Sequence, residues 1–323
     1  MCYQLWWHRN ASVMGPVPSL WGIWFEADAW AAAFWPAAAA LLCVAAVGYA
    51  VGVKRQRSCP PEAGPDQAVV AVRSRQILFY VGLLVVAFAI LSPLDTLSQW
   101  LFSAHMIQHL LLLVVAPPLL VASAPLDPLW RAVPDRLRGA IVARGSRLTK
   151  FAAIRRVSML LMSPWGALAV FAGTMWFWHI PGPYDLTLSN LYVHALEHTM
   201  FLAAGLLWWS RLINCPPLRA PLSTDTASMP ATMIFLMATV AQNVVLAMVI
   251  GLATHPLYAP YAALAHRPAG LSALADQEWG AGFMWTLGDL PFSIALGRLW
   301  YLWLSSLEAE EEASVCHGVG GPQ

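Results

Sequence analysis

Seven apolar stretches, each long enough to cross the hydrocarbon core of a bilayer, constrain the fold of this chain most strongly. At a rise of 1.5 Å per residue, about 20 residues span roughly 30 Å of hydrocarbon. Charged residues make up only 11% of the chain, against roughly 25% in soluble domains. The sequence therefore predicts an all-α, polytopic membrane bundle. Its spans are expected near Trp30–Val53, Gln76–Ser92, Leu101–Ala122, Met159–Trp178, Leu191–Trp209, Ala231–Ala253 and Gly280–Leu304.

The spans divide the chain into three parts. Residues 1–29 form an extracytoplasmic lead-in without a cleavable signal peptide, 30–304 the transmembrane domain, and 305–323 an acidic cytoplasmic tail. The five cysteines are scattered and include no C-x-x-C pair, so neither a disulfide framework nor a thiolate metal site is expected. Pro117-Pro118 is expected to kink or end the third span, because proline lacks the N–H that continues a helix.

Basic residues are distributed very unevenly between the two sides of the predicted bundle. Loops 54–75, 124–158 and 211–228 lie on one side and hold 15 of the 18 Lys and Arg residues. Only Arg9 and Arg267 lie on the opposite side, and Arg298 is near the inner end of the last span. The positive-inside rule therefore predicts an external N-terminus and a cytoplasmic C-terminus.

Five of the nine histidines fall within spans or at their ends, and this topology places all five toward the outer face. They lie on three different predicted helices: His105, His109, His179, His194 and His198. Intramembrane ionisable residues are costly and mark functional sites by default. The sequence therefore predicts a histidine cluster that opens outward.

Spacing indicates what this cluster binds. His105 and His109, like His194 and His198, are four residues apart, so each pair shares a helix face and can ligate one metal ion. We expect His179 to cover these four imidazoles. Imidazole suits copper, zinc and iron, whereas a thioether suits Cu(I). The candidate secondary groups are the thioethers of Met106 and Met175, the outer-shell carboxylates of Glu197 and Asp276, and Asp289 within the last span.

Other interpretations of these residues stay open at this stage. A single intramembrane histidine can simply bond a neighbouring helix, and a histidine chain with acids can relay protons. Asp289 either faces a cavity or bonds near the carbonyl that Pro291 leaves free. Gln242-Asn243 is expected to supply interhelical hydrogen bonds. Zinc, or one haem between the third and fifth spans, is an alternative to copper.

Several ordered motifs resemble the membrane cytochrome c oxidase assembly proteins called CtaG, of the bacterial aa-type oxidase kind. The resemblance runs from Trp24 to about Leu304, with one departure at Glu278-Trp279-Gly-Ala-Gly282. It rests on Ser92-Pro-Leu-Asp95, Phe102-Ser-Ala-His-Met-Ile-Gln-His-Leu-Leu111, Ala116-Pro-Pro-Leu119, Trp178-His-Ile-Pro181, Tyr184-Asp185, His194-Ala-Leu-Glu-His198, Pro256-Leu-Tyr-Ala-Pro-Tyr261, Asp276-Gln277 and Met284-Trp285.

The resemblance implies a non-catalytic assembly factor of the bacterial cytoplasmic (inner) membrane that assists copper insertion. Its expected partners are cytochrome c oxidase subunits, a periplasmic copper chaperone and the lipid bilayer, with no nucleic acid. Two other functions compete with this one. A membrane-embedded zinc hydrolase would use His109, His194, His198 and Asp276 around an activated water, and a metal-free scaffold would need no ligands.

Overall fold

The described part of the chain is helical throughout, with no strand. The computed structural model describes residues 29–57, 65–148, 151–213, 228–264 and 267–318, so the predicted lead-in lies almost wholly outside it. The helices are α3 Ala29–Arg57, α4 Pro65–Leu91, α5 Pro93–Leu97, α6 Phe102–Leu110, the π-helix η1 Leu111–Val115, α7 Ala116–Ala122, α8 Leu126–Ala132, α9 Asp135–Leu148, α10 Ala152–Leu161, α11 Pro164–His179, α12 Pro181–Thr187, α13 Leu191–Trp209, α14 Met229–Gly251, α15 Ala259–Ala262, the 3-10 helix η2 Pro268–Gly270 and α16 Ala273–Gly318.

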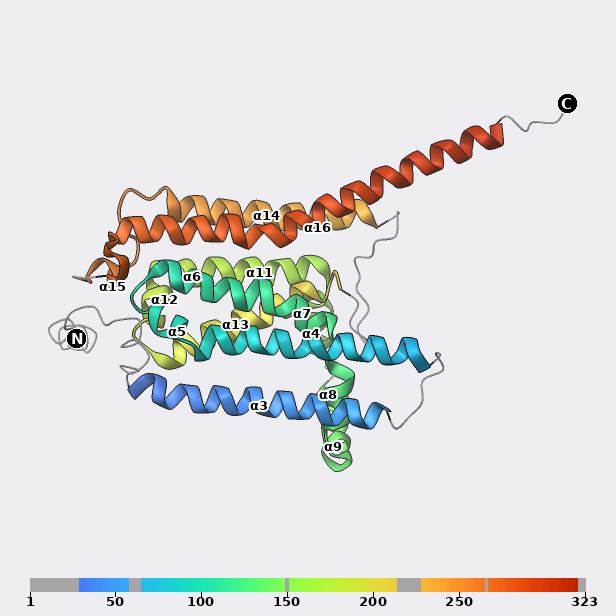
Figure 1. Cartoon of the computed structure of the whole chain (residues 1–323), viewed down its shortest axis with the longest axis horizontal. Coiled ribbons are helices and arrows are strands. Elements are labelled where there is room, and N and C mark those ends of the chain that lie inside the picture. Colours follow the sequence, from blue (N-terminus) through green and yellow to red (C-terminus); the bar gives the residue numbers. More distant parts are fainter. Residues whose placement is uncertain (1–28, 58–64, 149–150, 214–227, 265–266, 319–323) are drawn as a thin grey trace.

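The long helices run side by side and form a bundle (Figure 1). Helix α16 packs along α14 and α6, α4 packs on α7, and α13 packs on α11 and η1. The short helices α5, α12 and α15 lie together at one end of the bundle, and α8 and α9 lie at the other (Figure 1). We call the first of these the short-helix end, because it contains the residues discussed below.

Five predicted spans each fall on one long helix, the third on the consecutive elements α6, η1 and α7, and the fourth on α10 and α11. Several of these segments are apolar and long enough to cross a membrane. Four candidate spans lie in the described residues, or five if the bent pair α10 and α11 counts as one. They are Trp35–Gln56, Val72–Leu91, Phe102–Ala122, Met229–Gly251 and the bent pair. The chain is therefore a helical membrane protein. That it has seven membrane spans stays a prediction.

Several helix boundaries differ from the predicted spans: α4 and α16 begin earlier, at Pro65 and Ala273, and two further boundaries differ as follows. The fourth span was expected to begin at Met159, but α11 begins at Pro164 and α10 lies at 78° to it. Ser163 interrupts the helix because it precedes a proline, and its hydroxyl then caps α11 by accepting the Gly166 N–H. At the other end of the chain, α16 does not stop near Leu304 and continues to Gly318.

Pro117-Pro118 does not end the third span, which stays helical from Phe102 to Ala122 and accommodates the prolines through a π-helix. Pro117 and Pro118 have no N–H to donate to the carbonyls one turn earlier. The chain adapts by widening to the π-helix η1 and starting α7 with these prolines in its first turn. Gly205 of α13 packs against this segment, because a Cβ there would lie 2.6 Å from the Leu113 carbonyl oxygen.

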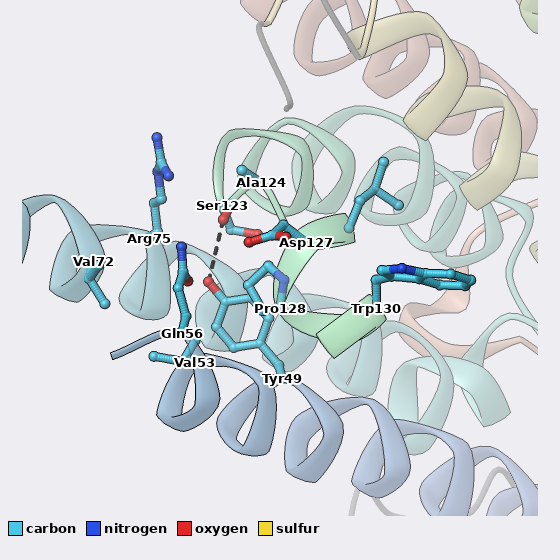
Figure 2. Close-up of a pocket in the computed structure, with 11 residues that line it drawn as sticks. Tyr49, Val53, Gln56, Val72, Arg75, Ser123, Ala124, Asp127, Pro128 and Trp130 are labelled. Carbon is cyan, nitrogen blue, oxygen red and sulfur yellow. Dashed lines mark hydrogen bonds between the residues drawn. The ribbon is translucent and has the colours of Figure 1, made fainter. Parts of the chain in front are cut away.

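A cavity of about 530 Å³ lies between α3, α4 and α8, away from the short-helix end (Figure 2). Its lining is mainly apolar, with Gln56, Arg75 and Asp127 as polar members, and Tyr49 closes one side by donating to the Ser123 carbonyl at 3.3 Å. It contains none of the predicted site residues.

Close packing of α3 on α8 yields a stability prediction. A Cβ on Gly52 would lie 1.8 Å from the Pro128 carbonyl oxygen, whereas one on Gly48, a turn earlier, would make an ordinary contact at 3.6 Å with Leu129. Gly52→Ala should therefore lower the free energy of unfolding by about 1–3 kcal/mol, as overpacking does. Gly48→Ala should be neutral or stabilising by about 0.5–1 kcal/mol. Thermal unfolding in detergent measures both, and equal midpoints would contradict this packing.

Candidate metal centre

Three helices bring the five predicted histidines together inside the bundle. Helix α6 carries His105 and His109, α13 carries His194 and His198, and α11 ends at His179. All five side chains are buried, with at most 5% of any residue exposed. The two i, i+4 pairs face each other, since the His105 and His194 rings stack with centroids 5.3 Å apart and the His109 and His198 centroids are 5.8 Å apart.

Four side chains form the tightest group, which we call the histidine–glutamate cluster: His105, His109, Glu197 and His198. Each offers one ligand atom, and these atoms all lie within 4.8 Å of one another. The Glu197 carboxylate lies between the two imidazoles of α6, with one oxygen 3.3 Å from His105 Nε2 and the other 3.3 Å from His109 Nε2. The sequence indicated Glu197 as an outer-shell carboxylate, and the structure places its carboxylate against both imidazoles of α6 and among the converging ligand atoms.

Helix caps fix the level at which these side chains meet. Asn190 caps α13 by accepting the N–H groups of Tyr192 and Val193, which sets His194 and His198 in its first two turns. Asp276 of α16 caps α6 by accepting the N–H groups of Phe102 and Ser103 at 2.6 and 3.2 Å.

Asp276 thus has a different role from the one predicted. Its two oxygens accept from the backbone of α6 and from the Ser103 hydroxyl, so it fixes a helix instead of orienting an imidazole. It belongs to neither group of converging ligand atoms found in the described residues. The four-residue constellation that a zinc hydrolase would need is not assembled.

A second group of ligand atoms adjoins the first and shares His198 with it. It consists of Asp95, His194 and His198. His194 Nε2 lies 2.9 Å from His198 Nε2 and 4.0 Å from Asp95 Oδ1. Asp95 is already held by Gln108, whose amide donates at 2.8 Å, and by the Trp35 indole at 3.2 Å. It therefore lies behind His194 as an orienting carboxylate.

His179 does not cover the four imidazoles evenly. Its Nε2 points to the sulfur of Met106 at 3.3 Å, and its Nδ1 donates to the Met175 carbonyl at 2.6 Å. Its ring is 5.9 Å from that of His109. The Met106 thioether, a candidate secondary group from the sequence, thus has a partner on α11.

The side chains of the histidine–glutamate cluster fit a set of metal ligands. Two of its buried nitrogens, His109 Nδ1 and His198 Nδ1, lack a hydrogen-bond partner among the described residues, while His109 Nε2 and Glu197 Oε1 contact each other at 3.3 Å. An unsatisfied buried polar atom costs about 1–3 kcal/mol. Native proteins rarely leave several in one place. Imidazole nitrogens and a carboxylate oxygen fit copper or zinc.

Tyrosines separate the cluster from the short-helix end. Tyr261 donates to the Ser98 carbonyl at 2.5 Å, lies 3.3 Å from His105 Nδ1, and approaches the Tyr184 hydroxyl at 3.4 Å. Burial raises the pKa of the Tyr261 phenol well above its ordinary value, so it stays a neutral donor. Beside it, burial raises the pKa of the Asp185 carboxyl to about 6.

Asp289 and the polar pair of α14 lie apart from the histidines. Asn243 donates to Asp289 at 2.8 Å, and Gln242 accepts from the Trp176 indole at 3.1 Å. The predicted interhelical hydrogen bonds of Gln242-Asn243 are confirmed. Asp289 bonds to Asn243, a partner the sequence did not indicate, and joins neither ligand group among the described residues.

Two residues near the site were not predicted as site residues. Asp95 and Tyr261 both lie in motifs that carry the family resemblance, but neither has a spacing that points to the histidines. Only the fold brings them there, across sequence separations of 99 residues from Asp95 to His194 and 156 from His105 to Tyr261.

The chain matches a known protein family over most of its length. The family model described as "Cytochrome c oxidase caa3 assembly factor (Caa3_CtaG)" matches residues 47–306. The chain belongs to this family. The match includes every histidine of the site, so the cluster lies within the family's own region. The CtaG resemblance is thereby confirmed, and membership favours a role in oxidase assembly and not catalysis.

Two curated relatives are similar at lower identity. The "Uncharacterized protein Mb0105" of Mycobacterium bovis and the "Uncharacterized protein MT0111" of Mycobacterium tuberculosis are each 25% identical over 266 residues. The aligned region is 80% of this chain but 37% of each relative, so the chain spans little more than a third of their length. No solved structure matches the chain.

Proposed function

We propose that this protein binds copper at the histidine–glutamate cluster and passes it to a cytochrome c oxidase subunit during assembly. The observation that carries the proposal is the group of four converging ligand atoms within 4.8 Å, in side chains that leave two buried imidazole nitrogens without a partner among the described residues. Family membership supports the oxidase as client. Copper is the cargo of the protein, and no catalytic turnover is required.

Charge favours copper in its monovalent form. Three neutral imidazoles and the Glu197 carboxylate carry a net charge of −1, so a monovalent ion would leave the filled cluster neutral. A divalent ion such as zinc would leave one uncompensated positive charge among side chains that are 0–5% exposed. Buried uncompensated charge is costly, and it is most costly in a membrane protein.

Delivery also requires release, and the ligand set is consistent with it. Thiolates bind Cu(I) strongly, so a cysteine site would release it slowly. Imidazole and carboxylate donors bind Cu(I) less tightly, which favours release. Cys43 is exposed on α3 and belongs to neither ligand group. The tyrosines at the short-helix end cover the cluster, so loading requires that Tyr184 and Tyr261 move apart.

The orientation and location are part of the proposal. With basic loops on the cytoplasmic side, the short-helix end faces outward from a bacterial inner membrane. A periplasmic chaperone could then load the cluster, and membrane helices of the oxidase could receive the ion. A metal-free scaffold would leave the buried Nδ1 atoms of His109 and His198 without a partner among the described residues.

The proposal is tested in cells. A deletion strain grown under copper limitation should make oxidase protein and haem but lack oxidase copper and activity. Wild-type protein should restore both, and His109→Ala should restore neither, although immunoblots show it in the membrane. His255→Ala, an exposed histidine outside the cluster, should restore both. A deletion strain with a fully copper-loaded, active oxidase would overturn the delivery role.

A further inference from the structure

One imidazole near the cluster has its tautomer fixed by the backbone. His179 Nδ1 lies 2.6 Å from the Met175 carbonyl oxygen. A carbonyl can only accept a hydrogen bond, so Nδ1 carries the proton. In the neutral ring Nε2 then carries only a lone pair. Ligating histidines in metalloproteins usually have this arrangement, in which the ring's other N–H donates to a carbonyl or carboxylate.

That lone pair is directed at another acceptor. His179 Nε2 lies 3.3 Å from Met106 Sδ, and a thioether sulfur has no proton to donate. Both residues are buried, His179 with 5% and Met106 with 0% of its surface exposed. Two facing lone pairs with no proton between them gain nothing from each other. A cation placed between them would bind both.

The geometry suits a metal ion. Metal bonds of about 2.0 Å to nitrogen and 2.3 Å to sulfur would span the 3.3 Å edge at an angle of roughly 100°, close to tetrahedral. Methionine often fills gaps in cores, but Met106 has little freedom to do so here. A Cβ on Gly280 would lie 3.1 Å from its Cγ, so α16 packs directly on this side chain.

We propose that His179 and Met106 form a second metal site, selective for a soft monovalent cation such as Cu(I) or its analogue Ag(I). Thioether donors select Cu(I) over harder divalent ions. The site is separate from the histidine–glutamate cluster, whose donors are nitrogen and oxygen. His109 lies between the two, with ring centroids 4.3 Å from His105 and 5.9 Å from His179.

This second site rests on the proposed function and extends it. The chain would hold two Cu(I) ions one imidazole apart, and His109 would border both. An ion could then move between a sulfur-containing site and a nitrogen–oxygen site without leaving the protein interior. Zinc, which the thioether does not favour, would occupy only the cluster.

The test uses the purified full-length chain in detergent, without oxygen and under reducing conditions. Cu(I) is titrated against a chelating dye, and X-ray absorption detects the neighbours of bound copper. Wild type should bind two Cu(I) ions and show sulfur at about 2.3 Å. Met106→Leu, which conserves volume, should bind one and show no sulfur. Met233→Leu removes a buried methionine from the first turns of α14, far from the short-helix end, and should match wild type.

Zinc binding distinguishes the proposal of the His179–Met106 site from the proposal that the histidine–glutamate cluster binds metal. Met106→Leu should bind one Zn²⁺ as tightly as wild type does, which also shows that the variant is folded. Copper bound by wild type with nitrogen and oxygen neighbours only would overturn the His179–Met106 site and leave the cluster intact. The His179–Met106 site is also wrong if Met106→Leu keeps the sulfur signal. If wild type binds neither Cu(I) nor Zn²⁺, the cluster proposal fails as well.

Discussion

Replacing His109 and His198 together by alanine should abolish Zn²⁺ binding and remove at least one bound Cu(I) ion. The double change removes two of four ligands and leaves His105 and Glu197 at 3.3 Å from each other, whereas zinc sites take three or four protein ligands. Loss of an outer-shell partner alone weakens metal binding about 10–100-fold, so loss of two ligands should exceed that. Metal analysis after dialysis measures the effect.

The control for this experiment is His255→Ala, because His255 is exposed near the short-helix end and contacts Thr254. It should retain the metal content of wild type. Glu197→Gln completes the series, since it keeps the shape of the side chain and removes its charge. It should bind Zn²⁺ and Cu(I) more weakly than wild type. Equal metal content in wild type and the double variant would show that the cluster is not a metal site.

Much of the site could be predicted because its residues are regular in sequence. The i, i+4 spacing places His105 with His109 and His194 with His198 whatever the rest of the fold does, and the structure joins the two pairs. A local distortion at Pro117-Pro118 was predictable for a similar reason, because it follows from the missing N–H of proline, although the helix does not end there. Local rules suffice for such features.

The side chains that complete the site were candidates in the sequence, but their positions follow from packing between helices and could not be predicted. The rotation of α13 relative to α6 decides whether Glu197 faces the imidazoles, and spacing along one helix does not fix that angle. Met106 gained a partner because α11 ends beside α6. Asp276 looked available in sequence, but the free N–H groups of Phe102 and Ser103 engage its carboxylate. Helix ends need such partners wherever they are buried.

The fourth helix shows the same limit. Apolar composition alone extended the predicted span back to Met159, since Leu160, Leu161 and Met162 continue the run. A proline after Ser163 stops the helix locally, and the serine caps the next one at a different angle. Hydropathy measures how apolar a segment is and does not report where its axis bends.

The second prediction concerns the orientation of the bundle in the membrane, and its outcome is all-or-none. Fifteen of 18 basic residues lie in loops on one side of the predicted spans, and such loops stay cytoplasmic. A reporter that is active only outside the cytoplasm should therefore work when fused after Ser98 or Tyr184, and fail after Gly64 or Gly139. A reporter active only inside should give the opposite pattern, which controls for expression.

This result decides more than topology, because Ser98 and Tyr184 lie at the short-helix end with the histidines. Ser98 accepts from Tyr261, and the Tyr184 ring is 5.1 Å from that of His105. If both positions are external, the cluster opens toward the compartment in which a periplasmic chaperone would load it. An active external reporter at Gly139 would turn the cluster toward the cytoplasm, and copper would then have to arrive from that side.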